Sequence, residues 1–269
     1  MPTVLDDIIV GVREDLEARR RETSLAQMRE RALQVAPARD AWAALRGGRS
    51  DASGLRVISE VKRSSPSKGA LADIPAPADL ARSYERGGAA VISVLTEQRR
   101  FGGSLADLDA VRAAVDIPVL RKDFTVDEYQ IHEARAHGAD LVLLIVAALD
   151  DAQLRDFLDL THELGMNALI EAHTQEEIER AAALKPRIIG VNVRNLKTLE
   201  VDPSSYGRLA PLLPSDVVQI AESGVDGPQD VAEYARHGAD AILVGEALVR
   251  HGDPAQAIRD FRSASAAVR

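Results

Sequence analysis

The chain has 269 residues, 46% hydrophobic and 28% charged, which excludes a disordered or collagen-like protein and matches the length of one α/β barrel. Its net charge of −9 argues against a nucleic-acid-binding surface, and the absence of cysteine excludes disulfides, thiolate metal sites and cysteine nucleophiles. The longest apolar run, Leu141–Leu149, is too short to span a membrane, and the N-terminus has no signal-peptide pattern, so a soluble cytoplasmic protein is expected.

The first 54 residues precede any strand-like segment and are predicted to form a helical extension. Two charged, amphipathic segments, Val10–Arg21 and Ser24–Val35, have the periodicity of helices. The sequence Gly-Gly-Arg-Ser at 47–50 is typical of a turn that leads into the next region. The three arginines at 19–21 stand beside glutamates, which favours a solvated helix face over a binding patch.

From about residue 56 onward, short runs of Val, Ile and Leu alternate with helix-period segments. Several runs are apolar without alternation, as in parallel strands buried on both faces. Gly88, Gly138 and Gly238 lie 50 and 100 residues apart, and each stands shortly before an apolar run, which indicates a repeating unit. The predicted strands are Val57–Val61, Ala90–Leu95, Pro118–Arg121, Leu141–Val146, Ala168–Glu171, Arg187–Asn192, Val217–Ala221 and Ala241–Val244. Eight such units predict an α/β fold, a (βα)8 TIM barrel at 55–269 with the N-terminal helical extension at 1–54, in a single domain.

Charged residues end these apolar runs, where a barrel of this kind has its active site. Side chains two residues apart share one face of a strand, so Glu60 and Lys62 are both predicted to face the barrel axis. A single acid–cation pair at the rim would ordinarily be a structural ion pair. Here three acids and three cations converge from different strands, which favours a catalytic site with perturbed pKa values. They are Glu60, Glu171 and Glu222, with Lys62, Lys122 and Arg194.

The loops after the strands have features of an anion-binding site. Residues 63–69, Arg-Ser-Ser-Pro-Ser-Lys-Gly, are compatible with a plain surface loop but are interpreted as a mobile lid over a substrate. Ser223-Gly224 and Gly245-Glu246 follow strands seven and eight, where small residues let backbone N–H groups approach a phosphate, and a short helix is predicted over 247–250. His173 fits either the rim or an ordinary loop position equally well.

Six segments together resemble the signature sequences of the indole-3-glycerol phosphate synthase family. The first, VISEVKRSSPS at 57–67, is highly specific, whereas Glu-Ser-Gly at 222–224 and the glycine after strand eight are shared with other phosphate-binding barrels. The other matching segments are Leu120–Phe124, Leu169–Glu171, Gly190–Leu196, Ala221–Gly224 and Leu243–Gly245. The resemblance covers essentially the whole chain in order, the N-terminal extension included.

The resemblance implies a carboxy-lyase of tryptophan biosynthesis. This family converts 1-(2-carboxyphenylamino)-1-deoxyribulose 5-phosphate to indole-3-glycerol phosphate, CO2 and water, with no metal or organic cofactor. Carried over residue by residue, the resemblance makes Lys122 the general acid at the substrate ketone. It places Glu171 and Lys62 in the proton transfers of the later dehydration, in an order that stays open. The supporting residues it implies are Glu60, Asn192 and Glu222, which orient substrate hydroxyls and the lysines, and Arg194, which supports the charge network.

The resemblance also implies the binding residues for a small anionic substrate. Phosphate is assigned to Ser65, Ser223, Gly224, Gly245 and the backbone of Glu246, and the anthranilate ring to Phe101 and Phe124. Many family members have Ser where this chain has Glu246. Because a carboxylate aimed at phosphate would be repulsive, we expect the Glu246 side chain to point outward while its N–H contacts the ligand.

Two alternative functions stay open from the sequence. A barrel like phosphoribosylanthranilate isomerase uses similar phosphate-binding loops, but its reaction would require a cysteine as general base, and this chain has no cysteine. A non-catalytic barrel that binds a phosphorylated metabolite would not need three acids beside an anionic ligand. A monomer or weak homodimer is expected.

Overall fold

The computed structural model describes residues 3–50, 52–67, 69–71, 73–196, 198–250 and 252–268, and it contains a closed barrel of eight parallel strands. The strands are β1 (Arg56–Val61), β4 (Val91–Leu95), β5 (Val119–Lys122), β6 (Leu141–Ile145), β7 (Asn167–Ala172), β8 (Ile188–Asn192), β9 (Val218–Glu222) and β10 (Ala241–Val244). They are hydrogen-bonded in the order β1-β10-β9-β8-β7-β6-β5-β4, and β4 pairs with β1 to close the ring. The predicted fold is confirmed, and each strand end lies within one residue of its predicted position.

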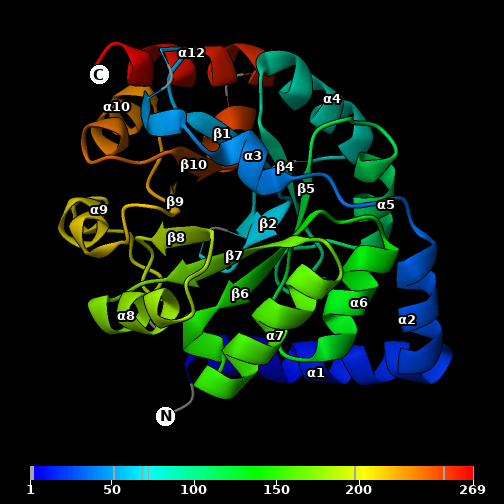
Figure 1. Ribbon diagram of the computed structural model, residues 1–269. Helices are drawn as coiled ribbons and strands as arrows, with labels where there is room; N and C mark the ends of the chain where they lie inside the picture. Colours follow the sequence, from blue (N-terminus) through cyan, green and yellow to red (C-terminus); the bar gives the residue numbers. More distant parts are fainter. Residues whose placement is uncertain are drawn as a thin grey trace.

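Helices alternate with the strands and surround the barrel (Figure 1). They are α4 (Pro77–Gly87), α5 (Leu105–Arg112), α6 (Glu128–Ala136), α7 (Asp151–Glu163), α8 (Gln175–Ala183), α9 (Ser204–Leu209), α10 (Pro228–Arg236), α11 (Glu246–Val249) and α12 (Pro254–Ala266). Short 3-10 turns lie at Gly48–Ser50, Val146–Ala148 and Ala210–Leu212. None of the described helices is long and apolar enough to cross a membrane.

Alternation along the strands divides the buried apolar side chains into two cores. On β1, Val57 and Val61 pack in the layer between the strands and the outer helices, whereas Ile58 packs inside the barrel. Leu120 of β5 and Leu169 of β7 share the inner core with Ile58. Because side chains two residues further along the same strands face the same way, Glu60, Lys122 and Glu171 stand directly above this apolar layer.

The N-terminal extension consists of three helices, α1 (Val4–Glu22), α2 (Leu25–Gln34) and α3 (Ala41–Leu45). Helix α1 begins six residues before the predicted start at Val10, because Thr3 and Asp6 form a capping box. The short helix α3 was not predicted. Its Ala41 and Leu45 belong to the inner core together with residues at the start of several strands, such as Val91 and Leu141. Helix α3 therefore closes the amino-terminal end of the barrel.

The repeated sequence His-Gly-Ala-Asp places two equivalent aspartates at that closed end. Asp140 accepts hydrogen bonds from the backbone N–H of Arg39, at 2.7 Å, and from the backbone of a neighbouring strand. Asp240 accepts from the backbone N–H of Arg49, at 3.1 Å, and likewise from a neighbouring strand. The two halves of the repeat therefore anchor the end of the extension to the barrel floor at two places.

Helix α1 is held against α6 and its N-cap by ion pairs, so the expected solvated arginine face is wrong for Arg19 and Arg20, whereas Arg21 is exposed as expected. The guanidinium of Arg19 donates to both oxygens of Glu133, at 2.8 and 3.2 Å, and Arg20 donates to Asp127 at 2.9 Å. The Glu133 side chain is only 1% exposed, and its second partner is Arg121 of β5, at 2.9 Å. This contact connects the extension to the strand that carries Lys122.

Candidate active site

A cavity of about 450 Å³ opens at the carboxyl ends of the strands. The structure brings together around it all fourteen residues that the sequence singled out. They are Glu60, Lys62, Ser65, Phe101, Lys122, Phe124, Glu171, Asn192, Arg194, Glu222, Ser223, Gly224, Gly245 and Glu246. These residues come from seven of the eight strands or the loops that follow them.

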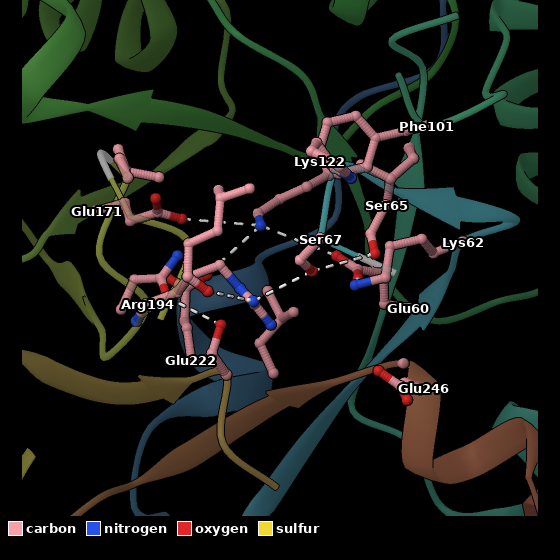
Figure 2. Close-up of a pocket in the computed structure, with 18 of the residues that line it drawn as sticks. Glu60, Lys62, Ser65, Ser67, Phe101, Lys122, Glu171, Arg194, Glu222 and Glu246 are labelled. Atoms are coloured by element: carbon pink, nitrogen blue, oxygen red, sulfur yellow. Dashed lines mark hydrogen bonds and ion pairs between the residues drawn. The ribbon is translucent and has the colours of Figure 1, made fainter. Parts of the chain in front are cut away.

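The ammonium group of Lys122 lies at the centre of the charged cluster (Figure 2). Its Nζ is 3.5 Å from Glu222 Oε2, 3.7 Å from Glu171 Oε2 and 3.8 Å from Glu60 Oε1. The other oxygen of Glu60 pairs with Lys62 Nζ at 2.7 Å. Glu60 therefore bridges the two lysines, and the prediction that Glu60 and Lys62 face the barrel axis together is confirmed.

Neighbouring charges determine the protonation of Lys122 and Glu60. Burial alone would lower the pKa of Lys122, but the neighbouring acidic side chains of Glu222, Glu171 and Glu60 outweigh it and hold that pKa above its usual value. Burial alone would raise the pKa of Glu60, but Lys62 and then Lys122 outweigh it and hold that pKa below its usual value. Both groups are consequently charged at neutral pH.

Glu171 and Glu222 respond to their surroundings in opposite directions. Burial and the charge of Glu171 raise the pKa of Glu222 well above its ordinary value, against the opposing effect of Lys122. Burial also opposes ionisation of Glu171, but Lys122 and His173 outweigh it and keep the pKa of Glu171 low. The raised pKa therefore favours a proton on Glu222, and the lowered pKa favours the negative charge on Glu171.

Two backbone features make room for this pair and for a ligand. A Cβ atom at Gly190 of β8 would lie 2.0 Å from Glu222 Oε1, so only glycine leaves space for that carboxyl group. Ser223 has a φ of +69° and Gly224 a φ of +71°. A left-handed serine is uncommon, and such conformations gather at binding sites. The strained turn is tied down by Tyr234, whose hydroxyl donates to Ser223 O at 3.0 Å.

Asn192 and Arg194 connect the loops after β8 and β9 to the loop after β1. Asn192 Oδ1 accepts from Ser223 Oγ at 2.9 Å and from the Arg194 N–H at 3.0 Å, which leaves its amide nitrogen to donate to a substrate. Arg194 Nη1 donates to Ser67 Oγ at 3.3 Å. The loop after β1 is a small hairpin of β2 (Ser64–Ser65) and β3 (Gly69–Ala70), and Lys68, part of the predicted lid, lies outside the described residues.

The opposite side of the cavity is apolar. The rings of Phe101 and Phe124 lie 6.1 Å apart and are tilted by 41°. The loop that carries Phe101 is organised by the buried Glu97, whose carboxylate accepts hydrogen bonds from three successive backbone N–H groups at 99–101. Val4, Leu5 and Ile8 of α1 complete this wall. Sequence reasoning missed them because the helix was predicted to start at Val10.

Glu246 lies at the start of α11, apart from the Lys122 cluster (Figure 2). Its carboxylate is hydrogen-bonded to the guanidinium of Arg250, one helical turn further on. Arg250 also donates to Asp226 at 3.1 Å. Arg250 lies outside the cavity lining, but Glu246 itself lines the cavity and its charge acts on Arg194 of the cluster, so the expected outward side chain stays a prediction.

His173 lies directly beside the charged cluster, and its side chain is 8% exposed. Its Nε2 is 3.3 Å from Glu171 Oε1. Of the two positions that the sequence left open, the structure places His173 at the rim, beside Glu171.

Among the described residues, no group of three or more histidine or acidic side chains is arranged to hold a metal ion.

Comparisons with known proteins agree on one family. The family profile described as indole-3-glycerol phosphate synthase matches residues 5–261. The indole-3-glycerol phosphate synthase of Micrococcus luteus is 69% identical over 99% of this chain and 100% of its own length. That of Paenarthrobacter aurescens is 68% identical over 98% of this chain and 97% of its own length. A crystal structure of 3-hexulose-6-phosphate synthase, 19% identical, superimposes with a TM-score of 0.63 over 78% of this chain and 99% of its own, which shows the shared fold alone.

Proposed function

The chain belongs to the indole-3-glycerol phosphate synthase family, and from that premise we propose how its side chains divide the reaction among them. The enzyme is a carboxy-lyase that forms the indole ring of its product with loss of CO2 and water. The ring carbon that bears the carboxylate attacks the ketone carbon, and the ketone oxygen becomes a hydroxyl group. Departure of CO2 returns its bonding electrons to the ring, and loss of that hydroxyl as water completes the indole.

Lys122 acts first, at the ketone oxygen. The observation that carries this role is its position, because the ammonium group lies within 3.8 Å of glutamate side chains from three other strands, inside the cavity. Its raised pKa keeps it charged, so it stabilises the negative charge that develops on the oxygen as the carbon–carbon bond forms. Proton transfer to the oxygen follows once that charge has developed.

The later dehydration is assigned to Glu171 and Lys62. An ionised Glu171 can accept the proton that leaves the substrate, and Lys62 can supply one to the departing hydroxyl. Glu60 pairs with both lysines and holds them in place. The raised pKa of Glu222 favours its protonated form, which can donate as well as accept a hydrogen bond when it orients a substrate hydroxyl. Asn192 and Arg194 complete this orientation.

The two ends of the substrate are assigned to the two sides of the cavity. Phosphate binds at the strained turn of Ser223 and Gly224, at Gly245, at the N–H of Glu246, and at Ser65 of the hairpin. The anthranilate ring binds against Phe101 and Phe124. This placement leaves the ketone between the two sides, next to the lysines.

The extension 1–54 and the barrel 55–269 are proposed to work as one domain. Helix α1 contributes three apolar side chains to the cavity wall, and the ion pair of Arg19 with Glu133 joins it to the barrel.

A monomer or weak homodimer is proposed because the exposed large apolar side chains are scattered over different elements rather than gathered in one patch. Sedimentation of the purified protein tests this. A cytoplasmic location is proposed because phosphorylated metabolites do not cross membranes unaided.

The reaction is tested by incubating the purified protein with the carboxyphenylamino deoxyribulose phosphate and following indole fluorescence. Product should form at the same rate with and without a chelator, since no metal is assigned a role. Replacing the central ammonium with an isosteric apolar group, in Lys122→Met, should lower kcat by about 10²- to 10⁴-fold. The matched control, Lys185→Met on an exposed turn, should behave like the parent enzyme. Unchanged kcat in Lys122→Met would remove Lys122 from the chemistry.

A further inference from the structure

The imidazole ring of His173 lies between two carboxylates. Its Nε2 is 3.3 Å from Glu171 Oε1, and its Nδ1 is 3.1 Å from Glu177 Oε2. The same oxygen of Glu177 also accepts the backbone N–H of His173, at 2.7 Å, so Glu177 holds both the main chain and the Nδ1 side of the ring. Exposed fractions of 8% for the histidine side chain and 3% for Glu171 show that the inner contact is shielded from water.

The chemistry of the two partners determines the charge of the ring. An ionised carboxylate can only accept hydrogen bonds, and a neutral imidazole has one N–H to donate. The Nε2 contact with Glu171 is an ion-pair contact without hydrogen-bond geometry, and only the imidazolium carries a proton on that side while it donates to Glu177 through Nδ1. Burial alone would lower the pKa of His173, but the hydrogen bonds and charges of both glutamates outweigh it and raise that pKa to about 10.

The contact with His173 gives Glu171 a second positive neighbour, on the side away from Lys122. Its Oε1 faces the imidazole and its Oε2 faces Lys122 at 3.7 Å, so the two oxygens are held between two cations. The other titratable group that acts on both residues is Glu222, whose raised pKa favours its protonated form. Without the imidazolium, the effect of burial on Glu171 would be opposed by Lys122 and by the hydrogen bond with Glu222.

We propose that His173 is a positioning residue for the reaction, a permanent imidazolium that fixes the orientation of Glu171 and keeps its carboxylate ionised as a base. This rests on the proposed role of Glu171 in proton transfer. A residue that only starts helix α8 would need the Glu177 contact but not the one to Glu171. The inner contact thus distinguishes a positioning role from a local structural one.

The first test is the pH dependence of kcat/KM. His173→Gln retains an N–H donor near the position of Nε2 but removes the charge, so the acid limb of the profile should move toward neutral pH by roughly one to three pH units. Glu177→Gln weakens the outer contact and should move the limb less, in the same direction. The matched control, His137→Gln, changes a histidine that pairs with Asp109 at the end of α6 and should leave the profile in place. A His173→Gln profile that is scaled down at every pH without moving would overturn the proposal.

The second test does not depend on activity. In the wild-type protein labelled with 15N-histidine, NMR should show one imidazole with both nitrogens protonated at pH 8, which His173→Gln assigns by its disappearance. A neutral ring at that pH would also overturn the proposal. Failure of the proposed function appears separately, because Glu171→Gln with full activity would exclude Glu171 as the base while leaving the NMR result for His173 intact.

Discussion

The protonated state of Glu222 predicts a specific change in how stability depends on pH. Glu222 is 1% exposed, and its pKa in the folded protein is well above 4.5, because of burial and the adjacent charge of Glu171. Folding therefore favours the protonated form. The resulting contribution to stability is fully present below pH 4.5 and is lost as pH rises toward the folded-state pKa. Over that window the cost is about 1.4 kcal/mol per pH unit for one proton.

Glu222→Gln replaces this carboxyl group with a neutral amide of the same shape that cannot ionise. As pH rises, the wild type should lose about 1.4 kcal/mol of stability per pH unit relative to the variant. For a chain of this size, that loss corresponds to a fall in Tm of roughly 3–6 °C per pH unit. Scanning calorimetry of both proteins from pH 5 to 8 measures the difference. Glu163→Gln, an exposed change at the end of α7, is the control for loss of a surface carboxylate. Wild-type and Glu222→Gln curves that run parallel across this range would refute the assignment of a neutral Glu222.

Two further predictions concern the walls of the cavity. Gly190→Ala places a methyl group 2.0 Å from Glu222 Oε1, so it should displace that carboxyl group, lower stability by about 1–3 kcal/mol and reduce kcat. Thermal melts and initial rates measure both, and an unperturbed kcat would contradict the proposed orienting role of Glu222. Arg250→Ala frees the Glu246 carboxylate beside the proposed phosphate site and should raise KM several-fold with little change in kcat, since one exposed charge is worth about 1 kcal/mol at 4 Å in water. Glu246→Ser should lower KM, and equal KM values for both variants and wild type would exclude Glu246 from the phosphate site.

The sequence predicted the barrel and the composition of its charged rim for one physical reason. Strand side chains alternate with a period of two, so an apolar residue such as Ile58 inside the barrel fixes the direction of Glu60 and Lys62 as well. The same rule applies to Leu120 and Lys122. Local periodicity was therefore enough to predict which residues meet, because the fold itself brings the strand ends together.

What the sequence could not show depends on contacts between distant residues. The ion pair of Arg19 with Glu133 joins residues 114 positions apart, and nothing near either one in the sequence indicates it. The opposite protonation of Glu171 and Glu222 likewise depends on which carboxyl group has more cations close to it. His173 remained ambiguous for the same reason, since its inner and outer partners become visible only in three dimensions.

Protonation also resolves an apparent conflict between the rim and its anionic substrate. By residue type, the rim has three acids and three cations, which gives no net charge to attract phosphate and carboxylate groups. With Glu222 protonated, two acids face three cations, and the proposed imidazolium of His173 adds a fourth. This cluster is then positive within a chain of net charge −9, although Asp123, Asp226 and Glu246 also line the cavity. The local field of the cluster favours binding of the anionic groups of the substrate next to Lys122, and because these groups are buried or half-buried, salt should screen that field less than it screens fully exposed surface charges.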